Sequence, residues 1–189
     1  MPPRRSPVSE RRVRLTAWER WAVSRAPVAP PRTSKGLVAY AKVVDVYDGD
    51  TVSAVFRHPR ERFHTVKLRV RGIDAPELRP SRDTPARDLH ARAGAAARRR
   101  LLELAPVGSV VVVECFGEDK YGRTLADVFV RPRRRVCGWI FRKKRTSVGQ
   151  QLLEEGYVLA YDGGTKAEFS EDFLARIASR GKGTKVSVV

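Results

Sequence analysis

The fold is decided by residues 37–56, which read LVAYAKVVDVYDGDTVSAVF. Two runs rich in β-branched and aromatic residues, 37–46 and 51–56, flank the short turn YDGD at 47–50. An Asp-Gly pair between two such runs is a strong signal for a β-hairpin. The stretch therefore predicts that the folded domain begins with an antiparallel hairpin whose turn carries two carboxylates.

Outside this hairpin, β-rich and helical patterns follow one another. Val66, Leu68 and Val70 share one face of a strand, and Thr84-Pro85 has the cap and first-turn residues that open a helix. In chain order, the sequence predicts strands at 37–46, 51–56, 66–70, 109–115, 124–130 and 136–141, and helices at 84–104, 147–155 and 168–179. The long helix is expected to face a core through the apolar stripe Leu89, Ala93, Ala96, Ala97, Leu101 and Leu104.

Basic residues dominate the charge of the chain. The 189 residues carry a net charge of +17, from 38 Lys and Arg against 21 Asp and Glu. Residues 1–36 hold nine basic and two acidic groups, and residues 131–145 hold eight basic groups and no acidic one. A strongly basic balance indicates a polyanionic partner such as nucleic acid. Because the remaining residues are nearly neutral, the sequence predicts a neutral domain with two basic appendages.

Composition also bounds the organisation of the chain. With 42% hydrophobic residues, it can bury a core and is not a disordered polyelectrolyte. The longest apolar runs are too short to cross a bilayer, and the first residues lack the apolar stretch of a secretory signal. We therefore favour an intracellular monomer without membrane attachment, with an organelle transit peptide as the alternative because the first segment is rich in Arg and poor in acidic residues. The predicted parts are a basic Pro/Arg-rich extension at 1–36, a domain at 37–180 with a basic insertion at 131–145, and a tail at 181–189.

Several metal and redox sites are excluded by residue type and spacing. Cys115 and Cys137 are too few for a disulfide framework, so they form two reduced structural thiols or one bridge. The three histidines are scattered, without a cysteine or carboxylate at zinc-ligand spacing. The segment that begins at Asp45 lacks the alternating ligands of an EF-hand.

Oxygen ligands are better placed to hold a metal. Asp50 opens one predicted strand and Asp74 closes another, so both carboxylates can reach one rim of a barrel and hold a hard cation such as Ca²⁺. Pro76 forces Ala75 into an extended conformation, which can leave the Ala75 carbonyl free as a further ligand. Glu77 lies three residues beyond Asp74, where it is free to act as a base.

Two arginines complete a candidate phosphate site. Arg69 lies on the opposite face of its strand from the apolar residues, and Arg123 lies just before a strand, so their guanidinium groups can converge on one phosphate. Each piece alone has a simpler interpretation, because Asp-Gly-Asp is usually only a turn and an arginine in a strand usually faces solvent. Three loops with matching chemistry are harder to explain in that way.

The motifs as a set resemble the staphylococcal nuclease-like (thermonuclease) family over residues 37–180. The matching stretches are VYDGDTV at 46–52, LRVRGIDAPE at 68–77 and DKYGRTLA at 119–126. The resemblance implies a mainly β, α+β fold, which is a five-stranded OB-fold barrel with about three helices.

The resemblance also implies the roles of individual residues. Asp50, Asp74 and the Ala75 carbonyl correspond to the Ca²⁺ ligands. Glu77 corresponds to the general base, and Arg69 and Arg123 to the arginines that hold the phosphate. Lys120, Tyr121 and Tyr161 resemble residues near the bound nucleotide, although a tyrosine at position 161 is equally compatible with a core position.

The implied activity is Ca²⁺-dependent endonucleolytic hydrolysis of DNA or RNA that leaves 3′-phosphate ends. Replacing Arg69, Glu77 or Arg123 is then expected to reduce catalysis without unfolding the protein. The alternative is a catalytically silent nucleic-acid-binding module, but such degenerate copies lose the acids and arginines that this chain keeps.

The basic insertion departs from the family pattern. We expect its charged residues to add contacts to the nucleic acid. A solvated loop or a nuclear-localisation-like cluster is the alternative. The candidate contacts are Arg133, Arg134, Arg135, Lys143 and Lys144.

Overall fold

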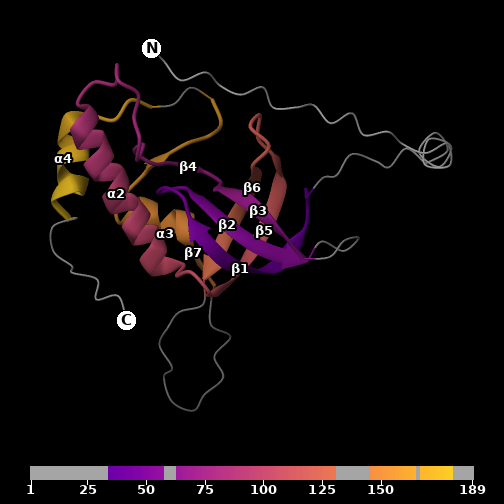
Figure 1. Ribbon diagram of the computed structural model, residues 1–189. Coiled ribbons are helices and arrows are strands. Elements are labelled where there is room, and N and C mark those ends of the chain that lie inside the picture. The colour runs from indigo at the N-terminus through magenta and orange to yellow at the C-terminus, as the bar shows by residue number, and fades with distance from the viewer. Residues whose placement is uncertain (1–33, 58–62, 131–144, 165–166, 181–189) are drawn as a thin grey trace, which may run out of the picture. The chain divides into compact units, whose positions relative to one another are not determined.

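The computed structural model describes residues 34–57, 63–130, 145–164 and 167–180 (Figure 1). Most of the basic extension, the strand predicted at 136–141 and the five candidate contacts of the insertion lie outside these residues. No helix in the described part of the chain is long and apolar enough to cross a membrane.

Five strands form a closed barrel. They are hydrogen-bonded side by side in the order β3-β2-β1-β5-β6, and each of these neighbouring pairs is antiparallel. A parallel pairing between β3 and β6 closes the sheet on itself. The predicted five-stranded barrel is therefore confirmed. The strands are β1 (Val38–Val46), β2 (Thr51–Arg57), β3 (Phe63–Val70), β5 (Val110–Glu118) and β6 (Thr124–Val130).

The barrel interior is filled by alternate residues of the strands. In β1, the pairing with β2 shifts by one residue between Val43 and Asp45. Because of this irregularity Val43 and Val46 both point inward and are fully buried. Cys115 lies in the same core, and burial raises the pKa of its thiol to about 11. Cys137 lies outside the described residues.

Within the described ranges, three helices pack beside the barrel. They are α2 (Arg87–Leu104), α3 (Val148–Glu154) and α4 (Glu171–Arg180). Leu101 of α2 packs into the barrel core, while Ala93 and Ala96 pack against Leu174 and Ile177 of α4. The helix α2 therefore lies between the barrel and α4, as Figure 1 shows.

Three two-residue strands complete the fold: β4 (Ile73–Asp74), β7 (Thr146–Ser147) and β8 (Leu159–Ala160). β4 pairs antiparallel with β8, which places Leu159 opposite Asp74 and the following Tyr161 beside Gly72. The sequence does not predict these strands, because two residues are too few to show a period.

The predicted start of the long helix is wrong by two to three residues. Thr84 does not cap the helix, because the N-cap position is taken by Ala86 and the Thr84 hydroxyl lies 3.0 Å from the Ser81 hydroxyl in a separate turn. The helix begins at Arg87, and the residue before it, Ala86, has a φ of 48° and no side-chain cap. This left-handed conformation is unfavourable for any residue with a Cβ atom.

We expect Ala86→Gly to increase the free energy of unfolding by about 0.5–1 kcal/mol. Relief of the left-handed strain exceeds the extra entropy of glycine in the unfolded chain. Urea denaturation followed by circular dichroism measures the change. The control, Ala91→Gly inside the same helix, should lower stability by about 1 kcal/mol, and a loss in both variants would contradict the strain at Ala86.

Candidate active site

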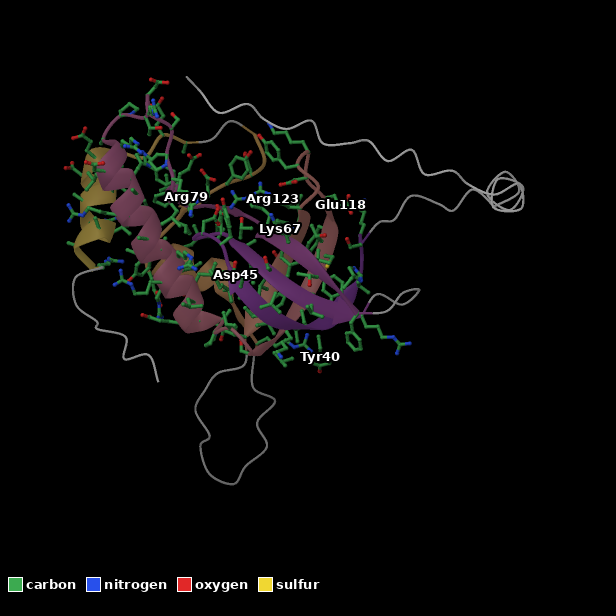
Figure 2. All side chains as sticks on the ribbon, in the orientation of Figure 1. Tyr40, Asp45, Lys67, Arg79, Glu118 and Arg123 are labelled. Atoms are coloured by element: carbon green, nitrogen blue, oxygen red, sulfur yellow. The ribbon has the colours of Figure 1, made fainter. Side chains whose placement is uncertain are left out.

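A groove of about 1370 Å³ crosses one end of the barrel. Its walls come from the β1–β2 turn, β3, the loop after β4, helix α2, the β5–β6 turn and the chain after β8. Figure 2 shows Lys67, Arg79 and Arg123 on this side of the molecule and Tyr40 away from it. The predicted site residues that line the groove are Asp50, Arg69, Ala75, Glu77, Lys120, Tyr121, Arg123 and Tyr161.

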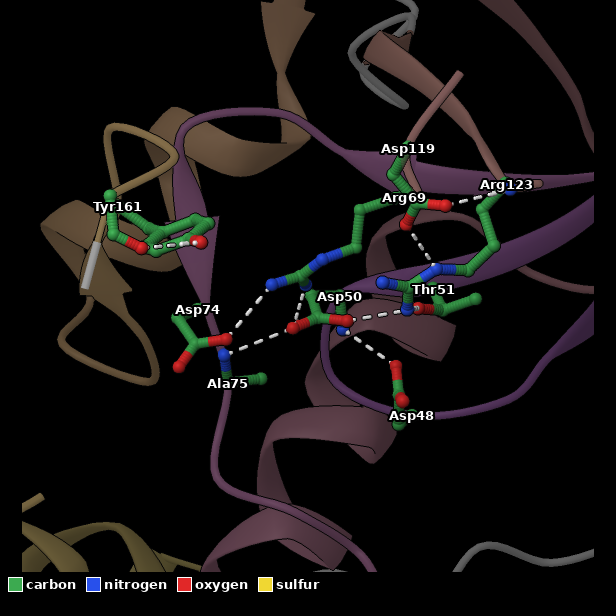
Figure 3. A network of polar contacts seen from close by, with 10 residues as sticks. Asp48, Asp50, Thr51, Arg69, Asp74, Ala75, Asp119, Arg123 and Tyr161 are labelled. Carbon is green, nitrogen blue, oxygen red and sulfur yellow. Dashed lines mark hydrogen bonds and ion pairs between the residues drawn. The ribbon is translucent and has the colours of Figure 1, made fainter. Parts of the chain in front are cut away.

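A buried ion-pair cluster forms the floor of the groove (Figure 3). The guanidinium group of Arg69 lies between two carboxylates, with Nη1 against Asp50 Oδ2 and Nη2 donating to Asp74 Oδ1 at 2.8 Å. Only 6% of Arg69, 5% of Asp50 and 2% of Asp74 are exposed. The structure therefore brings together the two predicted metal ligands and one predicted phosphate ligand.

Further hydrogen bonds fix the position of Asp50. Its Oδ1 accepts from the Thr51 hydroxyl at 2.9 Å, and its Oδ2 accepts from the Ala75 N–H at 3.1 Å. Its own N–H donates to Asp48 Oδ1 at 3.2 Å. These bonds tie the β1–β2 turn to the loop after β4, so both loops present their polar groups to the same place.

Two glycines allow this close approach. A Cβ atom at Gly49 would lie 2.7 Å from the Ala75 Cβ, and one at Gly94 would lie 2.7 Å from the Pro76 carbonyl oxygen. Helix α2 therefore packs directly on the backbone of residues 76–77 and holds Glu77 at the groove. The sequence predicts Gly49 only as a turn residue and gives no signal for Gly94.

The second arginine belongs to the β5–β6 turn. Arg123 Nε donates to Asp119 Oδ2 at 2.7 Å, and Nη1 donates to the Thr51 hydroxyl at 3.4 Å. Asp119 Oδ1 also accepts from the N–H groups of Tyr121 and Arg123 at 2.8 and 2.9 Å. Burial raises the pKa of Asp119, but the hydrogen bonds from Arg123 and Tyr121 outweigh it and hold that pKa below its usual value. Asp119 thus orients Arg123, a role that its place in the DKYGR motif could have suggested.

The remaining predicted residues lie along the rim. Tyr121 is 71% exposed, with Lys120 Nζ 5.1 Å from the centre of its ring. Tyr161 belongs to the groove wall and to neither hydrophobic cluster of the described core, and its hydroxyl donates to the Gly164 carbonyl at 3.0 Å. Glu77 is exposed and has no hydrogen-bond or ion-pair partner among the described residues.

A profile of the family described as staphylococcal nuclease homologues matches residues 67–187, well over half of the chain. The chain belongs to the staphylococcal nuclease homologue family. It is also similar to the probable endonuclease LCL3 of Coccidioides posadasii, with 33% identity over 112 residues, 59% of this chain and 32% of that protein. The corresponding protein of Paracoccidioides lutzii is 34% identical over 105 residues, 56% of this chain and 27% of that protein. The chain spans about a third of the length of these curated relatives.

The profile match begins at Lys67, after the β1–β2 hairpin. Asp50 and Thr51 therefore lie outside the matched region, yet Thr51 pairs directly with Arg69 in the β2–β3 ladder. This register explains how the hairpin contributes a carboxylate to a site whose other members follow it in the chain.

The carboxylates of Asp50 and Asp74 are ligands of the type that a hard cation prefers. Burial raises the pKa of Asp48, against the opposing effects of the Thr51 hydroxyl and Arg69. No group of three or more His, Cys, Asp or Glu side chains in the described ranges is arranged to hold a metal. A cation on Asp50, Asp74 and the Ala75 carbonyl would thus depend partly on water, which the flexible oxygen coordination of Ca²⁺ accepts. The cluster in Figure 3 has an excess of carboxylates, Asp48, Asp50, Asp74 and Asp119, over guanidinium groups, Arg69 and Arg123.

Proposed function

We propose that the groove hydrolyses phosphodiester bonds of DNA or RNA, and that residues 37–180 form the nuclease domain. The observation that carries this proposal is the convergence of Arg69 and Arg123 on the Asp50 and Thr51 side chains at the floor of one groove. Guanidinium groups held in this way suit a phosphate whose negative charge grows in the transition state.

Glu77 and the two arginines have different roles in hydrolysis. Glu77 accepts a proton from the attacking water, whose oxygen forms a new bond to phosphorus. The bond from phosphorus to the 5′-oxygen breaks, and that oxygen takes up a proton from solvent, to which Glu77 later returns its own, which leaves a 3′-phosphate and a 5′-hydroxyl. Arg69 and Arg123 stabilise the charge on the phosphate oxygens during this change.

The proposed cofactor is Ca²⁺, with Asp50, Asp74 and the Ala75 carbonyl as its protein ligands. When bound, the ion supplies positive charge beside the scissile phosphate. Both Nη atoms of Arg69 face these carboxylates in the structure. We therefore expect Arg69 to turn toward a phosphate when a cation neutralises its partners.

Binding of the polymer is assigned to the rim and to the basic insertion. Tyr121 and Tyr161 offer rings to a nucleotide, and Lys120 offers a charge to a phosphate. The basic residues of the insertion, for which only the charge can be argued, add contacts that weaken as salt rises. They are Arg133, Arg134, Arg135, Lys143 and Lys144.

We expect labelled single- and double-stranded oligonucleotides to be cleaved in Ca²⁺, to be cleaved weakly in Mg²⁺ and to stay intact in chelator. Mg²⁺ demands near-ideal octahedral geometry, which two carboxylates and a loop carbonyl do not supply. Gel electrophoresis before and after phosphatase treatment identifies the 3′-phosphate ends. Equal cleavage in chelator would reject the metal, and binding without cleavage in any metal would favour the silent module.

A further inference from the structure

A second aromatic side chain beside a cation lies on the rim of the groove, and none of the roles assigned above includes it. Tyr47 follows β1 and is 55% exposed. Lys67 of β3 places its Nζ 6.0 Å from the centre of the Tyr47 ring, and both residues line the groove. A tyrosine ring kept in water beside a lysine is not explained by packing of the core.

The hairpin turn holds Tyr47 in place relative to the catalytic cluster. The Tyr47 N–H donates to the Thr51 carbonyl at 2.9 Å and closes the turn. The next residues of the same turn are Asp48, which accepts from the Asp50 N–H, and Gly49, which packs against Ala75. The hydrogen bonds of this turn therefore fix the backbone of Tyr47 as well as that of Asp50.

The geometry of strand β3 fixes the position of Lys67 relative to Arg69. It lies two residues before Arg69 in β3, and side chains two apart in a strand share one face. The spacing along the strand is about 7 Å. Lys67 thus continues the row of positive charge from the buried Arg69 out to the exposed rim.

A tyrosine ring with cations beside it also occurs at the nucleotide contact predicted in the β5–β6 turn. Tyr121 of the β5–β6 turn is exposed, with Lys120 Nζ 5.1 Å and Arg123 Cζ 5.5 Å from its ring centre. The groove is therefore lined by an exposed tyrosine at each of two turns, with Lys67 of β3 beside the first ring and Lys120 and Arg123 beside the second. Grooves that bind single-stranded nucleic acid pair aromatic rings, on which bases stack, with cations that follow the backbone.

We infer that Tyr47 and Lys67 form a second nucleobase subsite, with the base stacked on Tyr47 and a neighbouring phosphate on Lys67. The identity of the ligand rests on the proposed function. Because a paired base offers no free face to a side chain, the subsite takes single-stranded or locally unpaired nucleic acid. It extends the bound strand beyond the nucleotides at Tyr121.

The test is binding of a fluorescein-labelled single-stranded oligonucleotide to Glu77→Gln protein, measured by anisotropy in Ca²⁺. Adding Tyr47→Ala should weaken binding about 5- to 100-fold, the range for loss of one base-stacking ring. Tyr47→Phe should retain the affinity, because the ring remains. The matched control is Tyr40→Ala, since Tyr40 is 62% exposed on β1 but lies outside the groove.

Two further measurements distinguish stacking from a structural effect. Abasic substitution at one position of the strand should weaken binding to protein with Tyr47 and have little effect on Tyr47→Ala. Lys67→Gln should reduce the slope of log Kd against log salt by about 0.7, the value for one phosphate on a single strand. The exposed Lys42 gives the control Lys42→Gln, which should leave the slope unchanged.

The outcomes separate this inference from the proposed function. If Tyr47→Ala and Tyr40→Ala bind alike while the wild type cleaves, the subsite is wrong and the nuclease proposal stands. Loss of affinity in Tyr47→Ala with a native thermal transition supports the subsite, whether or not the wild type cleaves. If the protein with Tyr47 binds no oligonucleotide, both proposals are overturned.

Discussion

Replacing Arg123 by alanine is expected to lower kcat by at least about 10²-fold, the scale for removing one charge that stabilises a transition state. The fold should survive, because Arg123 is only half-buried and its partners, Asp119 and the Thr51 hydroxyl, lie at the same groove. Single-turnover cleavage of a labelled oligonucleotide in Ca²⁺ measures the effect. Circular dichroism and the thermal transition report on the fold.

A matched arginine elsewhere on the barrel provides the control for Arg123. Arg71 donates to both carboxylate oxygens of Asp127, at 3.2 and 2.8 Å, and does not line the groove. Arg71→Ala removes the same charge and a comparable ion pair but lies outside the groove, so it should leave kcat within about twofold and lower stability by no more than about 1 kcal/mol. Wild-type kcat in Arg123→Ala, or equal losses in the two variants, would reject the phosphate role of Arg123.

Arg69→Ala should have the largest effect on stability, lowering the free energy of unfolding by about 3–5 kcal/mol in chelator. The substitution leaves Asp50 and Asp74 buried and facing each other without the guanidinium that separates them. Urea denaturation measures the loss. Added Ca²⁺ should restore part of it, because a cation on the two carboxylates replaces the missing charge.

The expected loss of stability limits the conditions in which the kcat of Arg69→Ala can be measured. The sequence predicts that this variant keeps its fold, whereas the buried position of Arg69 argues that it does not in the absence of metal. Its kcat is therefore informative only in Ca²⁺ and below its thermal transition. A loss of stability under about 1 kcal/mol in chelator would contradict the buried cluster.

The strands were the most predictable part of the fold. The predicted strand at 124–130 coincides with β6, and the Asp-Gly turn lies between β1 and β2 as expected. Both segments combine β-branched residues with clear turn signals, so local preference and tertiary structure agree. The start of α2 was less predictable, because a separate turn at 81–84 uses the residues that resemble a cap.

The site was predictable in residue type but not in environment. Alternation along β3 correctly puts Arg69 opposite the apolar residues, but it implies a solvated face. Closure of the barrel by the β3–β6 pairing and the pairing of β4 with β8 are long-range events that no local period reveals. They convert that face into a buried floor, which is why an ordinary strand arginine is 6% exposed.

The rim was harder to predict than the floor. Lys67 could have been inferred from its spacing to Arg69, since both belong to one face of a strand. Arg98 could not, because its Nε donates to the Val46 carbonyl at 2.7 Å only after α2 packs on the hairpin. Contacts of this kind depend on the packing of distant elements.

Glu77→Gln tests the central claim most directly. The substitution removes the proposed base but keeps size and shape, and Glu77 has no partner among the described residues whose loss could disturb the fold. The measurement is single-turnover cleavage of a labelled single-stranded oligonucleotide in Ca²⁺ at a series of protein concentrations, which gives both the rate at saturation and Kd. The proposed function predicts cleavage at least about 10²-fold slower than wild type at an unchanged Kd. Cleavage at the wild-type rate would contradict it, because proton transfer would then not depend on Glu77.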